Sequence, residues 1–182
     1  EKMTESGDYL YAAQVAADYL NDGEAAVEYQ YQGALAAMQE GDYKTAMSVF
    51  PTESDYKDSA SLAQECTYLY YTAEYKENGA SEEIARAFCF LGDFRDSEEM
   101  FKTVSYEYGM TCADKGDYAA AAAMFKNAGS YRGAENELNR ARYELGKSLM
   151  GPDPASARSV FALLSTYSDS AEFTDALGWA SF

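Results

Sequence analysis

Apolar side chains recur along the chain at the spacing of helices. Tyr43, Ala46, Met47 and Phe50 keep the i, i+3, i+4, i+7 intervals that place apolar residues on one face of a helix. No alternating pattern typical of a strand competes with this one, and the chain is predicted to be all-α. Short and long helices are expected to alternate near residues 8–20, 23–40, 42–51, 58–77, 81–91, 96–115, 117–128, 133–150, 153–165 and 169–181.

A recurring tripeptide marks turns between these helices. Gly-Asp-Tyr occurs at 7–9, 41–43 and 116–118, and in each copy an Ala follows three residues after the Tyr. Gly ends a helix in the left-handed conformation, Asp caps the next helix, and Tyr packs back on the previous one. Weaker copies start at Gly79 and Gly151. Helical hairpins are therefore expected to turn near Gly7, Gly41, Gly79, Gly116 and Gly151.

A second motif sits before the long helices. It reads aromatic-x-Asp-Ser at 56–59, 94–97 and 167–170, and Tyr-Arg-Gly-Ala at 131–134. We expect its Asp to cap the long helix that follows. Together the two motifs repeat with periods of 34 to 38 residues, which is typical of an array of helical hairpins.

The unit from Gly109 to Ala128 resembles the tetratricopeptide repeat. It carries that family's residues at the family's spacing: Gly109, Gly116, Asp117, Tyr118, Ala121, Phe125 and Ala128. Elsewhere the likeness is thinner, since Ala34 replaces the first Gly of an earlier unit and the family's boundary Pro is absent. The resemblance implies a right-handed α-solenoid of about four and a half tetratricopeptide-like hairpins. They would form a single domain over residues 1–182, part of a longer protein, with a concave groove that binds proteins or peptides.

Charge narrows the range of partners. The net charge is −17; residues 1–114 hold 23 acids and 7 bases (−16), and residues 115–182 hold 8 acids and 7 bases (−1). This balance disfavours binding to nucleic acid or to an anionic membrane surface. No stretch is apolar enough for membrane insertion. The acidic first half is interpreted either as a solubilising exterior or as a surface for a basic protein or peptide.

The residues give little support for catalysis. Histidine is absent, which removes the commonest general base and metal ligand. Cys66, Cys89 and Cys112 are odd in number and form no Cys-x-x-Cys pair, so we expect buried thiols and no zinc site. We expect no catalytic residue, metal or cofactor. Unpaired thiols favour a cytoplasmic location, and the extracytoplasmic part of a longer anchored protein is the alternative.

Tyrosines are the main functional clue, because Tyr is enriched in binding surfaces and the chain has 17. The resemblance places Tyr31 and Tyr106 where the family turns side chains into its groove. It gives Arg142 the equivalent place in the last unit, Tyr70 a place one residue beyond, and Met110 a neighbouring one. For these residues, groove and core remain alternatives.

Two functions follow from this interpretation. The first is a non-catalytic protein-protein interaction module that binds a peptide or partner domain in a Tyr-lined groove. The second is a structural spacer or assembly element of a larger multidomain protein, in which the groove is idle. Both a monomer and a self-associating chain are compatible with the sequence.

Overall fold

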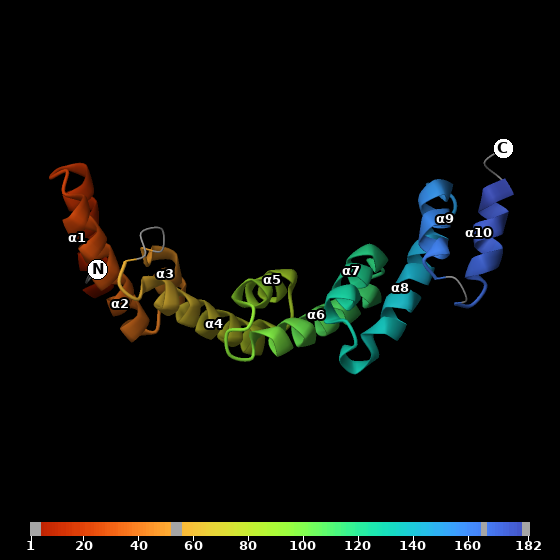
Figure 1. Ribbon diagram of the computed structural model, residues 1–182, viewed down its shortest axis with the longest axis horizontal. Helices are drawn as coiled ribbons and strands as arrows, with labels where there is room; N and C mark the ends of the chain where they lie inside the picture. Colours follow the sequence, from red (N-terminus) through yellow and green to blue (C-terminus); the bar gives the residue numbers. More distant parts are fainter. Residues whose placement is uncertain (1–4, 52–55, 165–166, 180–182) are drawn as a thin grey trace. The chain divides into compact units, whose positions relative to one another are not determined.

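The computed structural model describes residues 5–51, 56–164 and 167–179, and this part of the chain consists of helices joined by turns, with no strand (Figure 1). Each predicted helix has its counterpart, with ends that agree within three residues. The helices are α1 (Glu5–Asp18), α2 (Gly23–Glu40), α3 (Tyr43–Val49), α4 (Ser59–Asn78), α5 (Glu82–Leu91), α6 (Ser97–Asp114), α7 (Tyr118–Ala128), the 3-10 turn η1 (Tyr131–Gly133), α8 (Ala134–Leu149), α9 (Pro154–Ala162) and α10 (Ser170–Trp179).

The Gly-Asp-Tyr corners after α2 and α6 have the predicted geometry. Gly41 and Gly116 take the left-handed conformation, with φ of 81° and 77°. The carboxylate of Asp42 accepts a hydrogen bond from the backbone N–H of Thr45 at 3.0 Å, and Asp117 caps α7 in the same way. These two residues satisfy N–H groups that a helix start otherwise leaves unpaired.

The weaker copies also form corners. Gly79 ends α4 with φ of 78°, and the hydroxyl of Ser81 accepts a hydrogen bond from the backbone N–H of Ile84 in α5 at 3.3 Å. Asp153 caps α9, where Pro154 occupies the first turn. Proline is favoured there because its missing N–H would have no partner.

The first Gly-Asp-Tyr copy was expected to form a corner, and this expectation is wrong. Gly7 and Asp8 lie inside α1, and Gly7 is not among the residues with positive φ. A Gly at such a corner ends a helix by taking positive φ, whereas Gly7 continues one. Asp8 instead lies in the first turn, where the helix dipole favours an acid.

The Asp of the second motif also differs from expectation. Asp58 makes no capping hydrogen bond through its side chain; its Oδ1 accepts a hydrogen bond from the hydroxyl of Tyr31 at 2.6 Å. The carboxylate therefore links the corner to the preceding long helix, α2. A hydrogen bond from a hydroxyl to an ionised carboxylate is stronger than a neutral one, which favours this use of the side chain.

All four corners of the second motif share one unusual backbone conformation. The residue after the aromatic takes positive φ in each, although it is never Gly: Lys57 (50°), Arg95 (54°), Arg132 (46°) and Ser168 (52°). Because positive φ is uncommon outside Gly, its recurrence indicates that the same turn is built four times.

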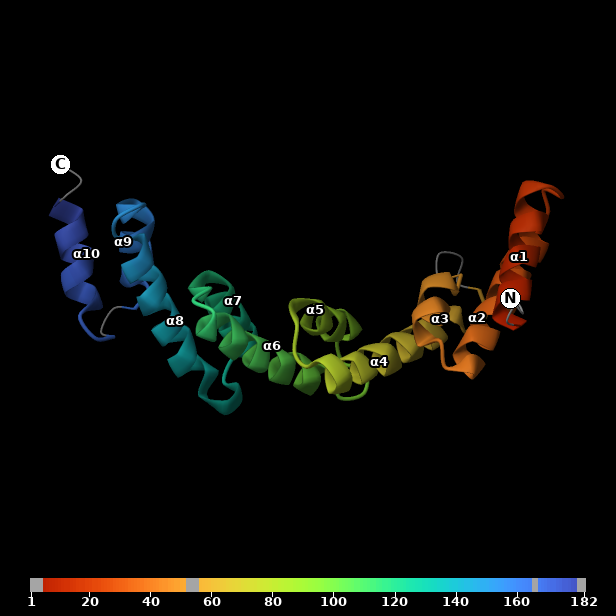
Figure 2. The ribbon, with the colours of Figure 1, turned by 180° about the vertical axis from the view of Figure 1, so that it is seen from behind.

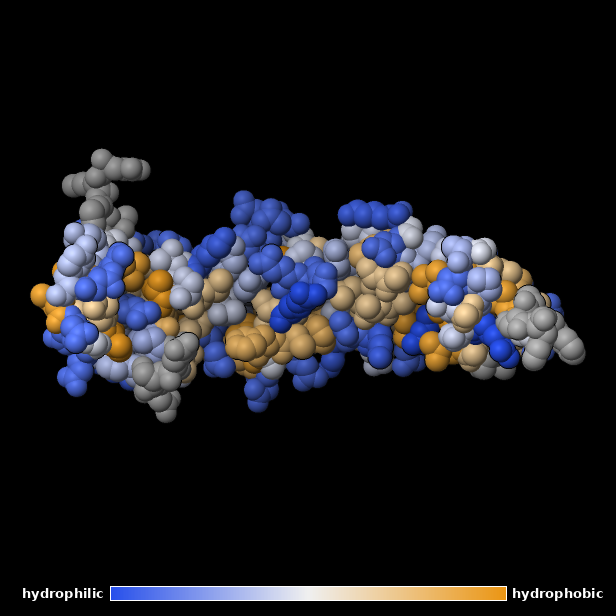
Figure 3. Space-filling view, turned by 90° about the horizontal axis from the view of Figure 1, so that it is seen from above, coloured by the Kyte–Doolittle hydropathy of each residue, from blue (hydrophilic) through white to orange (hydrophobic). Residues whose placement is uncertain are grey.

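The chain divides into two compact units. The first unit comprises Glu1–Gly79 and Phe90–Ser97, and in it α1 packs on α2, α2 on α3 and α3 on α4 (Figures 1 and 2). The second unit comprises Ala80–Cys89 and Glu98–Phe182, and in it α7 packs on α8, α8 on α9 and α9 on α10. Figure 3 shows, on the face it displays, hydrophobic side chains interrupted by hydrophilic ones.

Of the three thiols that were expected to be buried, Cys89 is exposed, while Cys66 and Cys112 are buried. Phe88, just before Cys89, is one of the residues that α5 buries in the core, and the next residue of a helix points about 100° away. Burial raises the pKa of the Cys66 thiol to about 11. This thiol therefore stays protonated at neutral pH.

Candidate functional site

Each of the long helices α2, α4, α6 and α8 carries one tyrosine that packs on the aromatic residue of the next corner. The two rings meet edge to face, with centroids 5.8 to 6.0 Å apart. Such pairs contribute about 0.5–1.5 kcal/mol beyond the area they bury. The pairs are Tyr31 with Tyr56, Tyr68 with Phe94, Tyr106 with Tyr131, and Tyr143 with Tyr167.

These pairs correct two of the equivalences drawn from the sequence. On α8, the residue equivalent to Tyr106 of α6 is Tyr143, not Arg142. Tyr143 is the residue of α8 that packs on the aromatic residue of the next corner. In α4 the place belongs to Tyr68, so Tyr70 lies two residues beyond it. Aromatic residues spaced 37, 38 and 37 apart carried this signal in the sequence.

The two candidate residues of the first unit have structural contacts. Tyr31 is 8% exposed, lies in the core of the unit and donates its hydroxyl hydrogen to Asp58. This hydrogen bond raises the pKa of Tyr31. Tyr70 is half-buried, with its ring 4.9 Å from that of Tyr71 and the ammonium of Lys44 5.8 Å from its centre. Tyr31 is thus a packing residue, whereas part of Tyr70 faces solvent.

The other three candidates belong to the second unit. Tyr106 and Met110 lie one turn apart on α6 and pack against the same core, formed around Phe125 and Ala141. Both are half-buried. Arg142 lies on α8, also half-buried, and has no ion pair with any described residue. The structure therefore brings Tyr106 and Met110 together on one helix face.

Tyr106 differs from its three counterparts in its hydroxyl. Tyr31, Tyr68 and Tyr143 donate to the corner Asp at 2.6, 2.6 and 2.7 Å. In the corner between α7 and α8, Gly133 stands where the others have Asp, and the Tyr106 hydroxyl makes no hydrogen bond to a described residue. Of the four equivalent hydroxyls, this one is available to a ligand.

Charge is also distributed unevenly among the corners. In the first unit Lys57 pairs with Glu28 at 2.6 Å, and Arg95 pairs with Glu65 at 2.5 Å. Hydrogen bonds from Lys57, Tyr56 and Gln32 lower the pKa of Glu28 to about 2. In each of these two corners, the cation is neutralised by a glutamate on the preceding long helix.

The corner between α7 and α8 has no such acid beside its cation among the described residues. On α6, Thr103 stands where α2 and α4 have Glu28 and Glu65. The guanidinium of Arg132 lies 5.2 Å from the centre of the Tyr131 ring and has no ion pair within the described part of the chain. The second unit thus has polar groups that the corner itself does not satisfy.

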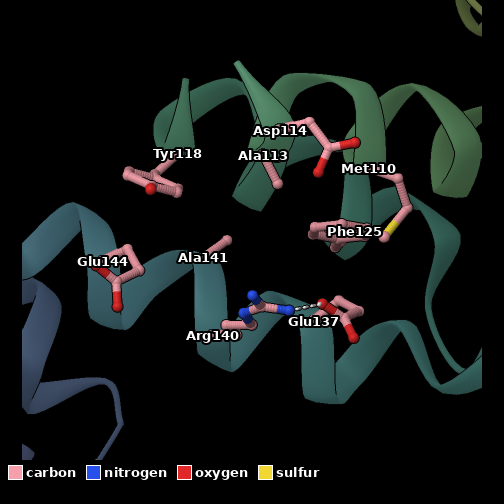
Figure 4. A pocket seen from close by; sticks show the side chains of 9 residues that line it. All are labelled: Met110, Ala113, Asp114, Tyr118, Phe125, Glu137, Arg140, Ala141 and Glu144. Carbon is pink, nitrogen blue, oxygen red and sulfur yellow. Dashed lines mark ion pairs between the residues drawn. The ribbon is translucent and has the colours of Figure 1, made fainter. Parts of the chain in front are cut away.

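A pocket of about 280 Å³ lies between α6, α7 and α8 (Figure 4). Its apolar side is formed by Met110, Tyr118 and Phe125. Phe125 also packs edge to face on Tyr106, with the ring centroids 5.9 Å apart. The ring of Tyr106 is therefore a direct neighbour of the pocket wall. The full lining is Met110, Ala113, Asp114, Tyr118, Phe125, Glu137, Arg140, Ala141 and Glu144.

Three carboxylates and one guanidinium line the pocket. Arg140 lies 3.8 Å from Glu137 on the same helix, and Figure 4 shows this pair extending from α8. Asp114 comes from the end of α6, on the other side of the pocket, and is exposed. It has no ion pair with a described residue. The lining is consequently negative overall.

Comparisons with protein-family models, with curated proteins and with solved structures give no match to this chain. Within residues 5–51, 56–164 and 167–179, no helix combines the length and apolar character needed to cross a membrane. The same residues contain no cluster of three or more His, Cys, Asp or Glu side chains arranged to hold a metal ion.

Proposed function

We propose that this chain is a non-catalytic protein-interaction module, an α-solenoid of tetratricopeptide-like hairpins that binds a peptide segment of a partner. The observation that carries the proposal is the pocket between α6, α7 and α8. It joins aromatic and thioether groups to unpaired charge, which is the composition of a small recognition site. The absence of histidine from the sequence agrees with a binding role rather than acid-base catalysis.

The recurring corners support the solenoid part of the proposal. A repeat of this kind cannot bury its apolar face alone, so each hairpin must stack on the next. The same left-handed residue and the same aromatic pair occur in four successive corners, and the helices of each unit pack on their sequence neighbours. The residues that recur between hairpins hold the hairpins together. Recognition of the partner is therefore assigned to residues that differ between hairpins.

Within the second unit, the proposal assigns partner contacts to Tyr106, Met110 and Arg142. Tyr106 offers a hydroxyl with no hydrogen bond to a described residue, and Met110 offers a flexible thioether that lines the pocket. Tyr70 is a further candidate on the first unit, because it is only half-buried. Tyr31 is assigned to packing.

Selection from a random octapeptide library displayed on phage, with the purified chain as bait, tests this function. Enrichment of related sequences that are lost on the variant Tyr106→Ala/Met110→Ala is the expected result. Glu172→Ala, an exposed substitution on α10, is the matched control and should leave enrichment unchanged. If no sequence is enriched above bare phage, the peptide-binding function is wrong.

A second function, assembly through self-association, is favoured by a different observation. Tyr11, Tyr19 and Leu20 on and just after α1 are 64%, 83% and 68% exposed, which is unusual for large apolar side chains so close together. Contact with a second copy of the chain would cover them. Light scattering over a range of concentrations decides: a mass that rises with concentration and falls back in Tyr19→Ser/Leu20→Ser supports assembly, and a constant monomer mass rejects it.

A further inference from the structure

We propose that the pocket between α6, α7 and α8 receives a cationic side chain, arginine or lysine, of the bound peptide. This inference rests on the proposed peptide-binding function and names the chemistry of the partner. The pocket volume of about 280 Å³ is below the usual range for a drug-sized ligand, about 300–1,000 Å³, and suits one long side chain.

Charge complementarity is the first argument. Of the three carboxylates, Glu137 lies near Arg140 at 3.8 Å and Glu144 near Lys147 at 3.2 Å. Asp114 has no ion pair with a described residue, so one full negative charge is left over at the pocket. A partner cation would compensate it, whereas an anion would meet net repulsion.

The position of Asp114 at a helix end is the second argument. Asp114 is the last residue of α6. The carboxyl end of a helix carries partial negative charge from its aligned peptide dipoles, and it attracts cations within the last turn. No basic residue occupies the last turn of α6 to meet that charge. The side chain and the helix end therefore favour the same sign of ligand.

The apolar wall is the third argument. Tyr118 and Phe125 present aromatic rings, and Met110 a thioether, on the side of the pocket formed by α6 and α7. Arginine and lysine bury their methylene stems along apolar surface while the charged head stays polar. An aromatic ring also attracts a cation over its face. A site for a small anion would need neither feature.

Two short peptides that differ only in charge test the inference. The first is acetyl-Ala-Ala-Arg-Ala-Ala-amide, and the second carries citrulline, the uncharged isostere, in place of arginine. Binding to the full chain is followed by chemical-shift changes in its amide spectrum. We expect the arginine peptide to bind roughly tenfold more tightly, and its affinity to fall as salt is raised, since charge pairs near a surface are screened.

Variants of the chain locate the binding. Asp114→Asn should weaken the arginine peptide by about fivefold, in line with a single exposed ion pair, and Asp114→Lys should abolish binding. Glu135→Gln, on α8 but outside the pocket, is the matched control and should change nothing. Circular dichroism melts of all three variants show whether each remains folded; Asp114 and Glu135 are both exposed, and we expect all three variants to stay folded at the temperature of the binding measurement.

The outcomes separate this inference from the function on which it rests. Equal affinity for the arginine and citrulline peptides, or unchanged binding by Asp114→Lys, would overturn the cationic-side-chain proposal. If the octapeptide selection then still enriches sequences that depend on Tyr106 and Met110, the peptide-binding function stands with a different partner chemistry. If that selection fails as well, both proposals are wrong.

Discussion

The hydroxyl of Tyr31 donates a 2.6 Å hydrogen bond to the carboxylate of Asp58, 27 residues further along the chain. This contact joins the middle of a long helix to the start of the next one. It recurs from Tyr68 to Asp96 and from Tyr143 to Asp169, and it is missing at Tyr106, where Gly133 stands in the place of Asp. The hydrogen bond between Tyr and Asp therefore stabilises the packing of each corner on the long helix before it. The one described long helix that lacks this bond, α6, is a helix that lines the pocket.

Loss of the hydroxyl should lower the stability of the protein at Tyr31 but not at Tyr106. Tyr31→Phe removes a buried hydrogen bond to a carboxylate and should lower the free energy of unfolding by about 1 kcal/mol. Tyr106→Phe removes a hydroxyl that has no described partner, and the change should stay within about 0.5 kcal/mol. Urea denaturation followed by circular dichroism measures both. Equal losses would show that the Tyr106 hydroxyl has a structural bond after all.

Replacing Ser97 with alanine is expected to stabilise the protein. Its side chain is 0% exposed, and its hydroxyl finds no hydrogen-bond partner among the described residues. An unsatisfied buried hydroxyl costs about 1–3 kcal/mol, so Ser97→Ala should raise the free energy of unfolding by about 1 kcal/mol. Ala134 already occupies the equivalent place in the third corner.

Ser170 provides the control for that substitution. Its hydroxyl donates to the backbone carbonyl of Tyr167 at 2.6 Å, so Ser170→Ala loses a hydrogen bond and should not be stabilising. Thermal melts of both variants give the comparison. A Ser97→Ala variant that melts earlier than the wild type would contradict the assignment of an unsatisfied hydroxyl.

Gly109 is required by close packing rather than by backbone conformation. A Cβ at this position would lie 2.9 Å from the Phe125 ring, which is 1% exposed and cannot move aside. Overpacking of this kind costs about 1–3 kcal/mol, more than the gain of about 1 kcal/mol from helix propensity, so Gly109→Ala should be destabilising. At Gly23 a Cβ would meet nothing within 4 Å, and Gly23→Ala should be neutral or stabilising. A thermal melt in which the two variants behave alike would refute this packing argument.

Glu28 should make the first unit sensitive to acid. Hydrogen bonds from Lys57, Tyr56 and Gln32 lower its pKa from 4.5 to about 2. Because the folded-state pKa is depressed, the stability it contributes is fully present above pH 4.5 and is lost as pH falls through about 2. Carbon-13 NMR titration of the Glu28 carboxylate measures the pKa directly. In Lys57→Gln, which removes the largest cause, it should rise toward 4.5, and an unchanged midpoint would contradict the assigned cause.

Much of the helical architecture could be predicted because its boundaries have local chemical causes. Gly41 and Gly116 end helices through their left-handed backbone, and Asp42 and Asp117 cap the next ones, so the spacing alone locates them. The copy at Gly7 misled the same reasoning, because this Gly lies inside α1 and does not take the left-handed conformation that ends a helix.

The candidate site was less accessible from the sequence. Met110 could be named because it shares a helix face with Tyr106, but Asp114, Glu137 and Arg140 could not. These residues come together only when α6 and α8 both border the pocket, and no spacing within either helix reveals that. Tyr68 and Tyr143 were missed for a different reason: their place is defined by the corner aromatic that each one contacts 24 to 26 residues later.

Methionine methyl NMR tests the central claim, that peptide recognition occurs at the pocket of the second unit, most directly. The chain has seven Met residues; Met110 lines the pocket, whereas Met47 packs against the core of the first unit. On addition of the arginine pentapeptide, we expect a saturable shift of the Met110 methyl signal, with the Met47 signal unchanged. Saturable binding that leaves Met110 unmoved and shifts Met47 would contradict it.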